Sequence, residues 1–145
     1  MSEKRQNPPI RRPKDHDELI KRLIAKDEYR NVDTPFTVMY DLLVFAASLG
    51  FKLEKRVPFS KSGEPIDFAT MKSNAYFEQL LSTIAVLTFE GDHTCLSDDR
   101  LAERIRLFEE YANGGLIELS ERLKKDHPSP SEYLEMLISQ EIANI

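Results

Sequence analysis

Asp41-Leu-Leu-Val-Phe-Ala-Ala-Ser-Leu-Gly50 is the segment with the strongest structural signal in this chain. It is almost wholly apolar, and apolar residues on most faces of a helix indicate a helix at the centre of a core. Thr34-Pro35 upstream combines a typical N-cap residue with a proline at the first helical position. Gly50 is a typical C-terminal stop. The sequence therefore predicts a buried central helix from Pro35 to Gly50.

Helical spacing recurs along the rest of the 145-residue chain. Apolar residues repeat every three or four positions in each of these segments, usually after a capping residue or a proline. The predicted segments are Pro13–Lys26, Asp67–Met71 (a short turn), Ala75–Phe89, a helix capped by Ser97, and a final helix from Ser129 to near Ile145. We expect an all-α fold, with about five helices in one compact domain over residues 13–145 and a disordered basic arm over residues 1–12.

Asn113-Gly114-Gly115 falls within the fourth predicted helix, and Leu116, Leu119 and Leu123 resume the helical period after it. Each glycine costs a helix interior roughly 1 kcal/mol relative to alanine, so the pair needs a physical reason. Two explanations remain open. The helix ends and restarts at the glycines, or another backbone or a ligand passes close to them.

The central helix is followed by a basic loop, Phe51–Ile66. Phe51 and Leu53 alternate with charged residues, which allows a short strand or hairpin within the loop. Pro58 and Pro65 keep the loop out of helix. A buried helix that carries a cation-rich loop is a common way to present a contact surface.

The formal net charge is −5, but the charges are unevenly distributed. Residues 4–26 hold eight cations and three anions, whereas the C-terminal half is acidic. A segregated distribution allows contact with DNA phosphates in spite of an acidic total, and solvated surface charge is the alternative interpretation. The candidate DNA-binding residues are Arg11, Arg12, Lys14, Lys52, Lys55, Arg56 and Lys61.

The sequence contains no recognisable catalytic or metal-binding motif. His93 and Cys95 lie near Asp92, but so few ligands in a turn make a poor metal site. Ser60-Lys-Ser-Gly63 lacks the spacing of a phosphate-binding loop. The single cysteine, the polar N-terminus and the lack of a long apolar run indicate a cytoplasmic protein. We expect no enzymatic activity, no metal and no cofactor.

Several blocks of the chain resemble the Dnd-system-associated protein 4 family, whose members are encoded beside bacterial DNA phosphorothioation genes. The blocks are Arg11-Arg-Pro-Lys14, Asp17-Glu-Leu19, Asp41–Gly50, Gly63-Glu-Pro-Ile66, Asp98-Asp-Arg-Leu101 and Phe108-Glu-Glu-Tyr-Ala-Asn-Gly-Gly-Leu116. The resemblance runs from Ile10 to Leu123. The order of elements is also similar to DndE, the small helical subunit of the same systems, which is associated with DNA binding.

The resemblance implies an accessory role in a bacterial DNA modification or restriction system, with no catalytic residues to carry over. Two hypotheses follow. In the first, the basic residues contact the backbone of double-stranded DNA. In the second, the chain is an adaptor that docks on other Dnd-system proteins without touching DNA, through its acidic C-terminal half and the Gly114-Gly115 break. Self-association is compatible with both, and neither involves a membrane.

Overall fold

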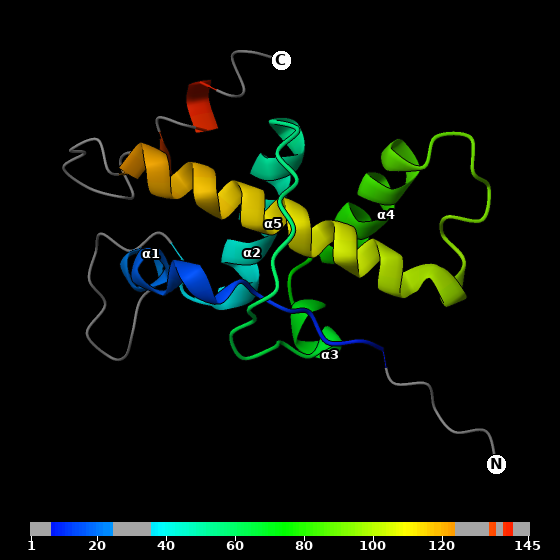
Figure 1. Ribbon diagram of the computed structural model, residues 1–145, viewed down its shortest axis with the longest axis horizontal. Helices are drawn as coiled ribbons and strands as arrows, with labels where there is room; N and C mark the ends of the chain where they lie inside the picture. Colours follow the sequence, from blue (N-terminus) through cyan, green and yellow to red (C-terminus); the bar gives the residue numbers. More distant parts are fainter. Residues whose placement is uncertain (1–6, 25–35, 124–133, 136–137, 141–145) are drawn as a thin grey trace.

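The computed structural model describes residues 7–24, 36–123, 134–135 and 138–140 of the chain. These residues form helices and loops, with isolated β-bridges but no strand, so the predicted all-α class is confirmed. The elements are η1 (Lys14–His16), α1 (Asp17–Leu23), α2 (Met39–Lys52), α3 (Phe68–Met71), α4 (Phe77–Thr88), η2 (Asp98–Arg100) and α5 (Leu101–Leu123). In Figure 1 the long helix α5 runs across the molecule, with α2 behind it and α4 beside its N-terminal half.

Helices α2 and α5 cross at glycines, where their backbones nearly touch. A Cβ atom on Gly115 would lie 1.8 Å from the carbonyl oxygen of Ala46, and one on Gly50 would lie 2.0 Å from that of Tyr111. A Cβ on Gly114 would meet the carbonyl oxygen of Lys55 at 1.8 Å. Helix α5 is continuous through these residues. The second explanation for the glycine pair is therefore correct: another backbone passes close by.

The end of α2 differs from the sequence prediction. The helix continues past Gly50 to Lys52, and the chain leaves it through Glu54, whose φ is +54°. Phe51 and Lys52 are therefore helical, and no strand forms there. Gly50 provides room for α5 at the crossing and does not act as a helix stop.

The start of α2 also differs, because the helix begins at Met39 and Val38 is extended. Phe36 donates its amide to the carbonyl of Leu23 at 3.0 Å and packs on Phe45. These tertiary contacts hold the chain extended where the local sequence favours helix. Thr34-Pro35 lies outside the described residues.

The predicted first helix consists of η1 followed by α1, and Pro13 precedes it as a buried residue. Its predicted end at Lys26 is outside the described residues. At the other end of the chain, residues 134–135 and 138–140 are helical, and Leu134 joins the core. The capping residues predicted for that last helix, Ser129 and Glu132, are likewise outside the described residues.

Aromatic side chains connect α5 to the smaller helices. Phe77 of α4 packs edge-on against Phe108 of α5, with ring centroids 5.2 Å apart, and against Phe68 of α3 at 5.4 Å. Phe77 and Phe108 are fully buried and face the same core as α2. Such pairs contribute roughly 0.5–1.5 kcal/mol beyond the area they bury. In the described part of the chain, no helix combines the length and apolarity needed to cross a membrane.

Candidate nucleic-acid interface

The N-terminal segment is fastened to the loop after α2. Ile10 and Ile66 exchange two backbone hydrogen bonds of 2.8 Å, and Ile10 is fully buried. Gly63 donates to the carbonyl of Arg12, and Lys14 donates to that of Lys61. The structure here differs from the predicted disordered arm, of which it describes residues 7–12: burial of Ile10 holds this part on the domain. Residues 1–6 lie outside the described residues.

The basic loop lies along α5 and is not held away from the domain. Figure 1 shows it crossing the face of α5 nearest the viewer. Val57 donates its amide to the carbonyl of Glu110 at 3.0 Å, and the side-chain amide of Asn113 donates to the carbonyl of Val57 at 2.9 Å. The basic loop, packed on α5, thus forms one wall of the domain.

Two of the predicted cations reach buried carboxylates on α5. Arg11 binds Glu109 through its backbone amide at 2.6 Å and its guanidinium at 3.2 Å. Arg56 binds Glu110 at 2.7 Å, and Arg106 adds a longer contact with Glu110 at 3.5 Å. Burial raises the pKa of Glu109, and the hydrogen bonds from Arg11 oppose that shift. The Glu-Glu pair therefore does not lie on a solvated face of α5, because both side chains are buried.

Two further predicted cations also have acidic partners. Arg12 pairs with Asp17 at 3.2 Å, and Lys55 pairs with Glu118 at 3.1 Å. Lys55 also lies 3.7 Å from Glu121. The hydrogen bond from Arg122, followed by that from Lys55, lowers the pKa of Glu118. Four of the seven candidate DNA-binding residues are therefore partly neutralised by carboxylates of the same chain.

The other three candidates, Lys14, Lys52 and Lys61, are exposed. The backbone hydrogen bond from Lys14 to Lys61 places two of these residues side by side. Lys52 ends α2 and takes part in an interaction of its own. The seven cations thus lie on the N-terminal segment, the end of α2 and the loop after it, and four of them form ion pairs that the sequence did not indicate.

A cleft of about 750 Å³ opens between η1, the loop and α5. Its lining residues are Asp15, His16, Val57, Pro58, Phe59, Ser60, Lys61, Asn113 and Ile117. Nε2 of His16 lies 2.8 Å from Oδ1 of Asn113. Because the Asn113 amide nitrogen already donates to Val57, Oδ1 is the acceptor and Nε2 of His16 carries the proton. Neither residue was a candidate from sequence.

The sequence carried a partial signal for these buried polar residues. Glu109 lies four residues after Ile105 and three before Ala112, so helical periodicity places it within the apolar stripe of α5. Asn113 precedes the glycine pair that allows the close backbone approach. What the sequence could not provide is the set of partners, since Arg11 and His16 come from nearly a hundred residues away.

The turn after α4 does not assemble a metal centre. The carboxylate of Asp92 accepts hydrogen bonds from Thr94 and Arg100, and Cys95 is buried. Among the residues that the structure describes, no group of three or more His, Cys, Asp or Glu side chains is placed to hold a metal ion.

A comparison with protein families complements this geometry. The family model described as DNA sulphur modification system-associated protein 4 matches residues 9–144. The chain belongs to this family. The resemblance to Dnd-system-associated protein 4 is thereby confirmed, and the family match extends past Leu123, where the recognisable sequence blocks end. No curated protein and no solved structure matches the chain. The likeness to DndE stays a prediction.

Membership links the chain to the DNA sulphur modification system. The family match includes the basic loop and all of α5. The wall that they form, with its ion pairs, therefore belongs to the family domain.

Proposed function

We propose that this chain is a non-enzymatic assembly component of a DNA sulphur modification system, which binds other proteins of the system and does not hold DNA by itself. The observation that supports this proposal is the pairing of Arg11, Arg12, Lys55 and Arg56 with carboxylates of the same chain. Affinity for DNA comes mainly from cations that replace the counterions of phosphates. A cation that already neutralises a carboxylate contributes little to that exchange.

The pairs with Glu109 and Glu110 are costly to open. Both carboxylates are buried, and removing the partner of a buried charge costs about 3–5 kcal/mol when the pair is fully enclosed. Arg11 and Arg56 are each nearly half exposed, so the cost here is smaller. The remaining cost would still oppose a contact between either arginine and a phosphate. These arginines are therefore better explained as residues that hold the N-terminal segment and the loop on α5.

A titration of labelled duplex DNA, with and without phosphorothioate linkages, tests the proposal at low and moderate salt. We expect at most weak binding at low salt, lost at moderate salt, for both duplexes. In parallel, the immobilised full-length chain should capture at least one purified protein of the same system. Duplex binding that survives moderate salt, or failure to capture any system protein, would overturn the proposal.

A second candidate function is direct DNA contact through Lys14 and Lys61. These exposed lysines are adjacent, and Lys61 lines the cleft beside His16. The paired variant Lys14→Glu/Lys61→Glu should then abolish duplex binding. Lys21→Glu is the matched control, because Lys21 is also exposed and lies on α1, away from the cleft lining.

The absence of enzymatic activity is part of the same proposal. Supercoiled plasmid incubated with the chain and magnesium should remain intact. Nicking that co-purifies with the chain and disappears in a single-residue variant would contradict it.

A further inference from the structure

Helix α4 buries one face and leaves the other open. Phe77, Leu81, Ile84 and Ala85 are buried in the core. On the opposite side Tyr76, Val86 and Leu87 are 68%, 48% and 60% exposed. With Leu96 in the loop that follows, this region holds four of the five large hydrophobic residues that are exposed in the described part of the chain.

Two of these exposed residues, Tyr76 and Leu87, belong to one stripe along the helix, and Val86 lies beside it. Tyr76, the half-buried Leu80, Thr83 and Leu87 succeed one another at intervals of four, three and four residues, which places them along one line of the helix. The outward residues beside this line, Gln79 and Val86, carry no charge. A helix face without charge is unusual in a chain of which 31% is charged, and such a face commonly marks a contact site.

The segment of the chain that contains the stripe is strongly acidic. Residues 73–103 contain six carboxylates and one guanidinium outside the buried core, a formal balance of −5 that equals the net charge of the whole chain. Arg100 is engaged by Asp92 and Glu103. Within the described residues, Glu78, Glu90 and Asp98 are exposed and form no ion pair. The negative charge of this segment is therefore only partly neutralised by ion pairs within the described residues.

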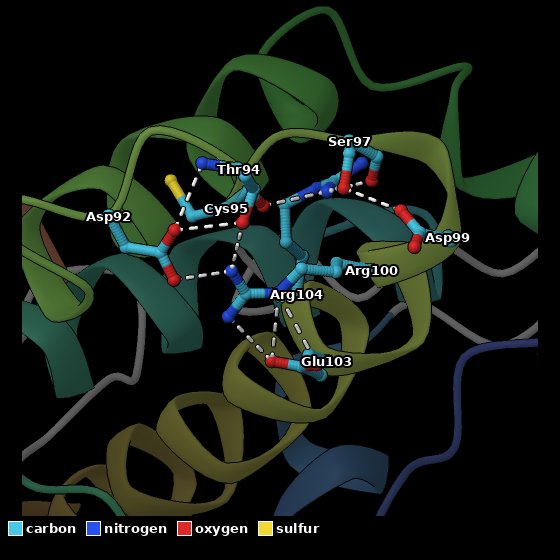
Figure 2. A network of polar contacts seen from close by, with 8 residues as sticks. All are labelled: Asp92, Thr94, Cys95, Ser97, Asp99, Arg100, Glu103 and Arg104. Atoms are coloured by element: carbon cyan, nitrogen blue, oxygen red, sulfur yellow. Dashed lines mark hydrogen bonds and ion pairs between the residues drawn. The ribbon is translucent and has the colours of Figure 1, made fainter.

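The loop that carries Leu96 is held in place by a polar network, drawn in Figure 2. The buried guanidinium of Arg104 donates to the carbonyls of Cys95 and Ser97 at 2.9 and 2.8 Å. Arg100 lies over the ring of Phe89 at 4.9 Å, and its hydrogen bond is the main cause that lowers the pKa of Asp92 to about 2. The loop that follows α4 is thus pre-organised, which reduces the entropy lost when a partner binds.

We propose that the outward face of α4 with the 89–97 loop docks a protein segment that presents apolar side chains flanked by lysines and arginines, such as a basic amphipathic helix. This inference rests on the proposed assembly function and names its surface. The apolar stripe would provide the buried centre of the interface, and the acidic rim would steer the basic flanks. The same negative charge disfavours DNA, and it disfavours a second copy of the chain, because a two-fold contact would oppose like charges.

A direct test uses two synthetic helical peptides as probes. One carries leucines at positions i, i+4, i+7 and i+11 with lysines elsewhere, and the other replaces the lysines with glutamates. We expect the full-length chain to bind the basic peptide at least tenfold more tightly than the acidic one. The variant Val86→Lys/Leu87→Lys should weaken binding of the basic peptide at least tenfold. Ile138→Lys, which changes an exposed apolar residue elsewhere, is the matched control and should leave binding unchanged.

Three outcomes would overturn the inference: equal binding of both peptides, unchanged binding by Val86→Lys/Leu87→Lys, or a concentration-dependent dimer that this variant abolishes. Circular dichroism checks that the variant is folded, and Glu90→Lys/Asp98→Lys tests the rim without touching the stripe. If the wild-type chain captures proteins of the modification system and the α4 variant captures them equally well, this surface is wrong while the assembly function stands. If the wild-type chain captures none, the assembly function fails.

Discussion

Two regions of the molecule use charge in opposite ways. One is the wall formed by the basic loop on α5, and the other is the outward face of α4. On the wall, Arg11 and Arg56 reach carboxylates that the same chain buries. Around α4, the carboxylates of Glu78, Glu90 and Asp98 stay in water, beside apolar side chains that no described residue covers. A cluster of cations in the sequence is therefore weak support for a nucleic-acid surface until the positions of the anions are known.

The difference follows from what each region does for the fold. The wall joins segments that are far apart in sequence, and ion pairs to buried groups give that junction a unique register. In the α4 region the polar contacts join residues close in sequence, from Asp92 to Arg104, and its packing on α5 is made by apolar side chains such as Phe77. Its uncompensated charge and exposed leucines contribute little to stability, so another role, such as partner binding, accounts for them better.

The largest loss of stability is expected from a substitution at the crossing of α2 and α5. Gly115→Ala places a Cβ 1.8 Å from a backbone carbonyl oxygen, which neither helix can move without loss of packing. We expect a loss of more than about 4 kcal/mol in the free energy of unfolding, measured by urea denaturation. Gly91→Ala is the control: its φ of +85° is strained for alanine but nothing lies within 4 Å, so roughly 1 kcal/mol is expected. Similar losses in both variants would mean that the crossing is looser than described.

The next largest effect concerns the wall itself. Arg56→Gln leaves the buried carboxylate of Glu110 with only the longer contact to Arg106, and should cost about 1–3 kcal/mol of stability. Lys61→Gln, which changes an exposed cation of the same loop, should stay within about 0.5 kcal/mol of wild type. Equal stability of the two variants in thermal denaturation would refute the role of Arg56 in holding the loop on α5.

The sequence predicts the features of this structure that depend on local signals, and it fails for those that depend on tertiary contacts. Helical periodicity predicts α4 and α5 and the all-α class, because those signals are local. The ends of α2 were misplaced, since the room that α5 needs at Gly50 and the pairing of Phe36 with Leu23 are tertiary effects. The candidate cations were chosen from their clustering in the sequence, and their partners on α5 could not be predicted without knowing which helix face meets the loop.

A smaller effect on the free energy of unfolding is expected when the pH is lowered. Hydrogen bonds from Arg122 and Lys55 lower the pKa of Glu118 below its unfolded value. The unfolded chain therefore binds the proton first, and this contribution to stability is present above the unfolded pKa and lost as the pH falls through the folded pKa. Glu118→Gln should lose roughly 0.5 kcal/mol at pH 7 and nothing at low pH. A pH-independent difference between variant and wild type would contradict the ion-pair explanation.

The smallest effect on stability is expected at α4. Val86→Lys/Leu87→Lys adds two charges to an exposed face and should change the free energy of unfolding by less than about 0.5 kcal/mol per site. A large loss would mean that this face is covered within the chain, and docking could not be tested with this variant.

The central claim is that the chain meets its partners through α4 and not through the basic wall. The most direct test is capture of the purified proteins of the modification system by three immobilised chains: wild type, Val86→Lys/Leu87→Lys and Lys14→Glu/Lys61→Glu. We expect the α4 variant to lose capture and the lysine variant to keep it. If capture survives in the α4 variant and disappears in the lysine variant, the partners bind at the basic loop and not at α4.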